Sequence, residues 1–352
     1  MNSIQQILEK AIRVDASDIF LVSRLPVTYK CRGRQMREGE ILMPNDILAL
    51  VEQIYDVSER DRACLEQGSD DDFAVSIPGL GRFRVNAFRQ RGSWAVVIRV
   101  IKFGLPDPAE LSIPESVLSL ADKKKGLVLV TGTAGTGKST TLACMIDRIN
   151  KTRDCHVITL EDPIEYVHRH EKSIVSQREI YIDTPSYLKA LRSALRESPD
   201  VILLGEMRDY DTISAALTAA ETGVLLLSTL HTSSAANTIN RILDVFPAGQ
   251  QSQVKIQLAQ ILRGVVCQQL LPAKDGGLIP AFEIMKSTPA IQTMIREDKL
   301  HQLDSAMQAG AADGMCTMDG SILKLYREGK ITRDTAVLSC VNYENMIKRI
   351  DG

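Results

Sequence analysis

The segment at residues 132–140 has the residue types needed to hold a chain of phosphate groups. It reads GTAGTGKST, follows an apolar run, precedes a helical pattern and fits G-x-x-x-x-G-K-[ST] at every fixed position. Glycines let the backbone curl so that its N–H groups face the phosphates. We expect Lys138 to reach the β- and γ-phosphates and the Ser139 hydroxyl to hold Mg²⁺, with ATP as the nucleotide. The predicted nucleotide contacts are Gly132, Thr133, Ala134, Gly135, Thr136, Gly137, Lys138, Ser139 and Thr140. A glycine-rich turn that binds nothing is disfavoured by this strand-to-helix context.

Two acidic residues follow the apolar run of "SPDVILLGEMRD", and Glu206 is nearer to the end of that run than Asp209. A carboxylate there can orient or deprotonate an attacking water, and phosphoryl transfer depends mainly on such positioning and on electrostatic stabilisation. The structural alternative is that Glu206 pairs with Arg208 or with a helix terminus.

A second acidic segment, "VITLEDPIEY", groups Glu161, Asp162 and Glu165 around Pro163, which ends the preceding strand. Carboxylates this close together repel one another unless a cation is present, and Mg²⁺ with its retained waters would relieve the repulsion. A solvated acidic turn is the alternative.

His231 ends a fourth apolar run, "LLLSTLHT". A single histidine is often structural, but its place beside three other polar strand ends favours a residue that senses the γ-phosphate or the hydration shell of the nucleotide.

Four apolar runs position these residues, at 126–132, 156–162, 200–206 and 223–231. Short runs of this kind are typical of strands buried on both faces, so we predict a mostly parallel sheet covered by helices. Ligands bind at the carboxyl ends of such strands. The apolar spacing of residues 254–271 predicts a helix, and residues from about 270 to 352 are predicted to be largely helical.

The first hundred residues predict a smaller unit. Ile4, Ile7, Leu8, Ala11 and Ile12 share one helical face, and residues 81–101 alternate as a hairpin with its turn at Arg91-Gly92. Three prolines follow within nine residues. We therefore predict an N-terminal domain at 1–102, a linker at 103–117 and a second domain at 118–352.

Composition limits the classes of protein and partner. The 352 residues suffice for two domains, and 42 basic against 44 acidic side chains give a net charge of −2, which argues against direct binding of nucleic acid. No apolar run reaches the roughly 18 residues of a membrane span, and the N-terminal segment is not typical of a secretion signal. We expect a cytoplasmic protein. The seven cysteines have no short metal-binding spacing and are expected to be free thiols.

In order and spacing, "GTAGTGKSTT", "ITLEDPIEY", "ILLGEMRD" and "STLHT" resemble the Walker A, Asp box, Walker B and His box of the type II/type IV secretion and pilus ATPases. "ASDIFL", "GRFRVNAF", "SQREI", "ALRSALRESPD", "LTAAETG", "NTINRILDVFP" and "PAIQTMIRED" resemble the PilT branch, the pilus-retraction ATPases. The resemblance covers nearly the whole chain. The lack of a four-cysteine zinc insertion and of a longer N-terminal extension also favours the retraction type.

The resemblance implies a PAS-like N-terminal α/β domain, a flexible linker and a RecA-like P-loop ATPase domain, assembled as a homo-hexamer. It makes Glu206 the catalytic glutamate, places Glu161 and Asp162 near the metal and gives His231 the role of the His-box residue. Arg84 and Arg99 match arginines that reach toward the nucleotide in this family. The competitors for that role are Arg82, Arg89 and Arg91.

The function implied is a motor that couples ATP hydrolysis to retraction of a type IV pilus, by acting on a platform protein at the cytoplasmic face of the inner membrane. The alternatives are a related motor for pilus extension, secretion or DNA uptake, and a slowly hydrolysing regulatory module. The chain departs from the family at Thr133, where proline is usual, and at Gln292, where the retraction-associated "AIR" motif has arginine. The second departure weakens the case for retraction and leaves ATP hydrolysis unaffected.

Overall fold

The computed structural model describes residues 3–31, 34–61, 63, 70–101 and 104–351. Contacts within the chain divide it into two compact units, Met1–Gly104 with Glu165–Val167 and Leu105–Ile164 with His168–Gly352. The predicted linker overlaps this division, although residues 102 and 103 lie outside the described residues. Helix α4 (Glu115–Leu118) already begins within the predicted linker.

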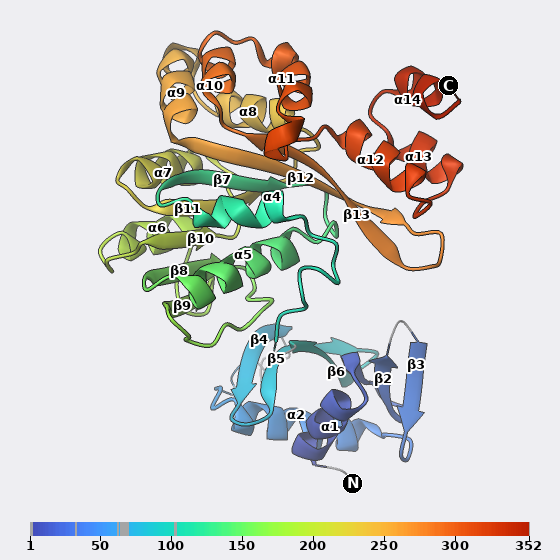
Figure 1. Ribbon diagram of the computed structural model, residues 1–352. Helices are drawn as coiled ribbons and strands as arrows, with labels where there is room; N and C mark the ends of the chain where they lie inside the picture. Colours follow the sequence, from blue (N-terminus) through green and yellow to red (C-terminus); the bar gives the residue numbers. More distant parts are fainter. Residues whose placement is uncertain (1–2, 32–33, 62, 64–69, 102–103, 352) are drawn as a thin grey trace. The chain divides into compact units, whose positions relative to one another are not determined.

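The first unit contains a six-stranded antiparallel sheet in the order β3-β2-β1-β6-β5-β4 (Figure 1). Its elements are α1 (Ile4–Arg13), β1 (Ala16–Leu21), β2 (Val27–Cys31), β3 (Arg34–Glu38), α2 (Pro44–Val57), β4 (Asp71–Ile77), β5 (Gly81–Gln90) and β6 (Ser93–Ile101). The predicted hairpin is confirmed, since β5 and β6 pair and Arg91 and Gly92 turn with φ of 48° and 80°. On α1 the predicted apolar face is buried except for Ile12, which is 40% exposed.

The second unit contains a seven-stranded sheet in the order β13-β12-β7-β11-β10-β8-β9. Its strands are β7 (Gly126–Thr131), β8 (His156–Glu161), β9 (Ile174–Glu179), β10 (Val201–Leu204), β11 (Leu225–Leu230), β12 (Leu262–Pro272) and β13 (Leu278–Lys286). All neighbouring pairs are parallel except β12 with β13. The four apolar runs therefore form β7, β8, β10 and β11, as predicted, and the α/β class is confirmed.

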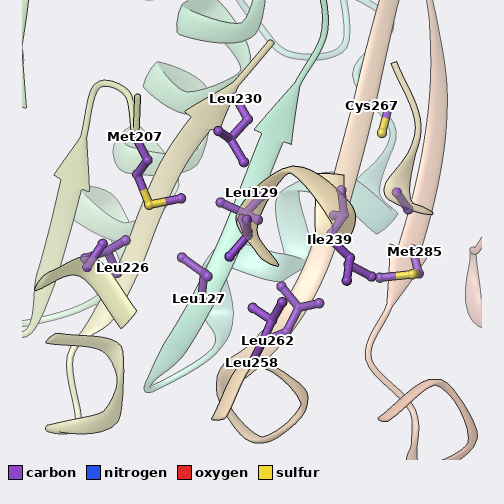
Figure 2. Close-up of a cluster of buried hydrophobic side chains, with 14 of the residues drawn as sticks. Leu127, Leu129, Met207, Leu226, Leu230, Ile239, Leu258, Leu262, Cys267 and Met285 are labelled. Atoms are coloured by element: carbon purple, nitrogen blue, oxygen red, sulfur yellow. The ribbon is translucent and has the colours of Figure 1, made fainter. Parts of the chain in front are cut away.

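Helices cover both faces of this sheet (Figure 1). Val128 and Val130 of β7 face a core shared with α4 and α5 (Lys138–Thr152), whereas Leu127 and Leu129 face the opposite core (Figure 2). The opposite core is shared with α6 (Tyr187–Ala194), α7 (Tyr210–Glu221), α8 (Ala235–Asp244) and α9 (Ala248–Ile261). Side chains that alternate between two apolar cores explain the uninterrupted apolar sequence of β7.

The prediction of a helix over residues 254–271 is wrong in its second half. Helix α9 ends at Ile261, and β12 follows without a connecting loop and pairs with β7. Gly264 disfavours a helix, the β-branched Val265 and Val266 favour a strand, and pairing with the central β7 outweighs the helical apolar spacing.

The predicted helical C-terminal portion begins later than expected, after β13. It consists of α10 (Pro289–Arg296), α11 (Leu303–Ala309), α12 (Met318–Arg327), α13 (Arg333–Ser339) and α14 (Tyr343–Asp351). Among the described residues, no helix is both long enough and apolar enough to cross a membrane. Six of the seven cysteines are free thiols, and Cys64 lies outside the described residues.

Candidate active site

The glycine-rich loop connects β7 to α5, at the carboxyl edge of the parallel strands. Gly132, Gly135 and Gly137 have φ of 146°, 79° and 85°, in the region that side chains with a Cβ rarely adopt. A Cβ at Gly132 would lie 2.4 Å from the backbone oxygen of Gln268, so that glycine is required by space as well as by conformation. The loop is thus packed tightly against β12.

Lys138 is the first residue of α5 and is only 9% exposed. Its ammonium donates to the backbone oxygens of Gly132, at 2.8 Å, and Thr133, at 2.9 Å. These bonds hold the positive charge over the start of the loop. Ser139 and Thr140 follow in the first turn of α5, a helix of fifteen residues whose positive N-terminal end favours phosphate at this place.

Gln268 of β12 also braces the loop, and the sequence prediction missed it. Its side chain is 4% exposed, and its Oε1 accepts a hydrogen bond of 2.8 Å from the Thr141 hydroxyl on α5. Its Nε2 lies 3.0 Å from the place where Gly137 would carry a Cβ. Gln268 therefore contacts both ends of the loop. Because we predicted a helix for this segment, the sequence did not indicate that Gln268 would approach the loop.

A cavity of about 440 Å³ adjoins the loop, within the size range of ligand pockets. Gly137, Thr140, Thr141 and Gln268 line it on the loop side, and residues 110–113 and the β12–β13 hairpin complete it. Leu111, Ile113, Leu270 and Ile279 add apolar surface. Its place and size suit the nucleoside part of a nucleotide whose phosphates lie in the loop.

Glu206 lies just past β10, with a side chain that is 15% exposed. Its Oε2 lies 2.6 Å from Nε of Arg208 and 3.7 Å from Nε2 of His231. The structural alternative for Glu206, a pair with Arg208, is therefore present, and it raises the pKa of Arg208. The Arg208 side chain is 73% exposed, and exposed pairs contribute little stability. The pair is thus no obstacle to a catalytic role for Glu206.

His231 follows β11 directly, and its side chain is half exposed. The structure brings it beside Glu206 from a neighbouring strand, because β10 and β11 are paired in parallel. The predicted gathering of these two residues at one sheet edge is observed.

The acidic residues at the end of β8 lie at the same edge. Glu161 accepts hydrogen bonds from the Thr159 hydroxyl, at 2.6 Å, and from Gln177 Nε2, at 3.3 Å. Burial, followed by the charges of Glu206, Asp162 and Glu161, raises the pKa of Tyr187. The charges of all three carboxylates therefore act on one partly buried tyrosine, which the sequence prediction did not include.

The predicted magnesium ligands were Ser139, Glu161 and Asp162. In the described part of the chain, no group of three or more His, Cys, Asp and Glu side chains could hold a metal ion. Mg²⁺ is usually bound by one or two carboxylates together with waters and substrate phosphates. The donor set at this edge fits that mode of binding.

Arg84 and Arg99 lie directly opposite each other on β5 and β6 of the first unit. Arg84 makes two bonds to Asp72, of 3.0 and 2.6 Å, and Arg99 makes one of 3.2 Å to Asp18. Carboxylates thus hold both guanidinium groups over one face of the sheet.

The three competing arginines differ in their surroundings. Arg89 stacks on Trp94, with its guanidinium carbon 5.1 Å from the ring centroid, and Arg91 lies in the hairpin turn. Arg82 is two residues from Arg84 on the same strand face.

Comparison with known proteins agrees with this geometry. The family model described as "Type II/IV secretion system protein" matches residues 1–312. The type IV pilus retraction ATPase PilT of Pseudomonas aeruginosa is 45% identical over 334 residues, 95% of this chain and 96% of that protein. The type IV pilus ATPase PilU of the same organism is 39% identical, over 95% of this chain and 87% of that protein. A crystal structure of the pilus retraction motor PilT with bound ADP superimposes with a TM-score of 0.91 at 45% identity, over 99% of this chain and 100% of that one. The chain therefore belongs to the type II/IV secretion system protein family and is a nucleotide-binding ATPase of the PilT type.

Proposed function

We propose that the chain is a hexameric motor that uses ATP hydrolysis to retract a type IV pilus. The observation that supports this most is the meeting of Glu206, His231 and the phosphate loop at one sheet edge, in a chain 45% identical to PilT over 95% of its length.

In this proposal residues 132–140 bind the phosphates of ATP. Ser139, Glu161 and Asp162 would hold Mg²⁺, which neutralises charge on the phosphates when it is bound. Glu206 accepts a proton from the attacking water as the water oxygen bonds to the γ-phosphorus. The bond from that phosphorus to the bridging oxygen breaks, and ADP and phosphate leave.

Arg208 and His231 have supporting roles in the same proposal. Glu206 must exchange its bond to Arg208 for the attacking water, and the exposure of Arg208 makes that exchange inexpensive. His231, whose Nε2 lies 3.7 Å from the same Glu206 oxygen that Arg208 contacts, would help to orient the carboxylate and would face the γ-phosphate. Arg84 and Arg99 would offset the negative charge that develops on the phosphoryl group in the transition state.

The proposed partner is a platform protein at the cytoplasmic face of the inner membrane, on which the hexamer acts. A motor for extension, secretion or DNA uptake is the second candidate, favoured by Gln292 at the start of α10, where arginine is expected in retraction motors. A slowly hydrolysing regulatory module is the third candidate.

Deletion of the gene separates the motor functions. Loss of a retraction motor leaves surface pili in excess and abolishes twitching, and complementation by the intact gene restores both. Cells without pili after deletion would show an extension motor instead. An unchanged number of surface pili would exclude both a retraction motor and an extension motor.

The catalytic assignment is tested on the purified protein. Glu206→Gln should lower kcat for ATP at least about a hundredfold, because the general base is lost, while ADP affinity stays within about threefold. Glu221→Gln, an exposed site at the end of α7, is the matched control. A wild-type rate in Glu206→Gln would contradict the assignment. A near-zero rate in an intact wild-type hexamer would favour the regulatory module.

A further inference from the structure

A buried carboxylate on β13, outside the proposed catalytic residues, binds the first residues of two helices. The side chain of Glu283 is 4% exposed. One of its oxygens accepts from the backbone N–H of Ala235 at 2.7 Å, and the other accepts from that of Met318 at 3.4 Å. Ala235 begins α8 and Met318 begins α12, each a helix of ten residues. The first N–H groups of a helix have no acceptor within the helix, so the two oxygens of Glu283 satisfy one such donor in each helix and attach both helices to the sheet.

Glu283 is also connected to the strand that leads into the phosphate loop. It lies opposite Cys267 of β12, and Cys267 lies opposite Thr131, the last residue of β7. The Thr131 hydroxyl donates to Cys267 Sγ at 3.1 Å, and that sulfur lies 3.7 Å from Glu283. Figure 2 shows Cys267 on this face of the sheet with Ile239 of α8 and Met285 of β13, members of the same core.

The bond to Ala235 has a consequence for His231. Residues 231–234 are the whole connection between β11 and α8. Leu230, before this connection, pairs with Thr131 of β7, and Ala235, after it, is bound by Glu283. A loop of four residues held at both ends has little freedom, so the separation of His231 from Glu206 depends on both attachments.

We propose that Glu283 is a positioning residue for ATP hydrolysis, which holds the His231 loop through the first amide of α8 and joins it to the start of α12. The proposal rests on the catalytic role proposed for His231. Through the same carboxylate, a movement of the C-terminal helices at α12 changes the position of His231.

Three variants test it in the full-length protein. Glu283→Leu removes both acceptors, whereas Glu283→Gln keeps one oxygen and approximates the shape. Met285→Leu, buried on the same strand two residues away, is the control for a change of similar volume. We expect Glu283→Leu to lower kcat about ten- to a hundredfold, with KM for ATP within about threefold, because misplaced catalytic groups slow the reaction while the phosphate loop still binds. Glu283→Gln should recover part of the loss, and Met285→Leu should keep the wild-type kcat.

A double-mutant cycle separates positioning from general destabilisation. In a His231→Ala background, Glu283→Leu should cause less than about a threefold further loss of kcat, because the residue through which it acts is already gone. Equal losses in both backgrounds would overturn the proposal, and so would a wild-type kcat in Glu283→Leu.

Hydrogen exchange gives a readout that does not depend on activity. In Glu283→Leu, but not in Met285→Leu, amides of residues 231–238 and 317–321 should exchange at least about tenfold faster than in the wild type. Unchanged exchange over 231–238 would overturn the proposal. A wild-type kcat in His231→Ala would instead disprove the role of His231, whatever the exchange shows.

Discussion

At the scale of single residues, the functional side chains at the carboxyl edge of the second unit are positioned by contacts with one another and with neighbouring side chains. Glu206 lies between Arg208 and His231, and Gln268 touches both ends of the phosphate loop. The sequence predicted the types and order of the site residues because each of them follows an apolar strand. The sequence did not predict their neighbours Tyr187 and Gln268, because a single tyrosine or glutamine has no sequence pattern that indicates what it will contact.

One residue-scale prediction concerns pH. Burial, followed by the charges of Asp147 and Asp107, raises the pKa of Cys144 on α5 from 9.0 to about 11. The unfolded thiol loses its proton first as pH rises, so the stabilisation is complete below pH 9 and is lost as pH rises toward 11. Between those values, wild-type stability should fall by up to about 3 kcal/mol more than that of Cys144→Ala.

Urea unfolding at pH 8 and at pH 10.5 measures this difference. Cys340→Ala, a thiol less deeply buried near the C-terminus, is the control for removal of a cysteine. Parallel losses of stability in wild type and Cys144→Ala would contradict the prediction.

At the scale of elements, β12 was the main error of the sequence prediction. Its residues have helical apolar spacing and continue directly from α9, but they form a strand between β7 and β13. Only the presence of an open edge on β7 decides this, and that edge is a property of the assembled sheet. The strand carries Gln268 and Cys267, so the phosphate loop is braced by an element whose nature the sequence did not show.

β12 therefore contributes to nucleotide binding. Gln268→Leu should weaken ADP binding about tenfold, because the Thr141 hydroxyl loses its acceptor and the loop loses its brace. Gln269→Leu, the next residue along the strand and directed to its other face, is the matched control. Titration calorimetry with ADP measures both, and equal affinities would show that the brace is dispensable.

At the scale of the whole molecule, two units with separate cores carry different parts of the proposed mechanism. The second unit holds the phosphate loop, Glu206 and His231, and the first holds Arg84 and Arg99. The boundary predicted from three clustered prolines falls close to the division between Gly104 and Leu105. The assignment of 1–102, 103–117 and 118–352 as domains and linker stays a prediction.

If Arg84 and Arg99 act on the phosphoryl group, their loss should lower kcat and leave nucleotide binding almost unchanged. Arg84→Gln and Arg99→Gln should each lower kcat by about ten- to a hundredfold, because charge on the phosphoryl group loses its partner, while ADP affinity changes little. Arg37→Gln, exposed on β3 of the same sheet, is the control. Loss of ADP binding without a separate loss of kcat would contradict the proposed role.

The sequence by itself determined the α/β class, the strands that end in functional residues and the phosphate loop, because these depend on local apolar patterns and on glycine spacing. It also showed the family, because its motifs keep their order along the chain. Only the tertiary structure decided that residues 262–272 form a strand, that Gln268 braces the loop and that Glu283 binds the starts of α8 and α12. Those contacts join residues far apart in sequence, and which partners meet depends on strand order and on the competition for buried space, neither of which any single segment encodes.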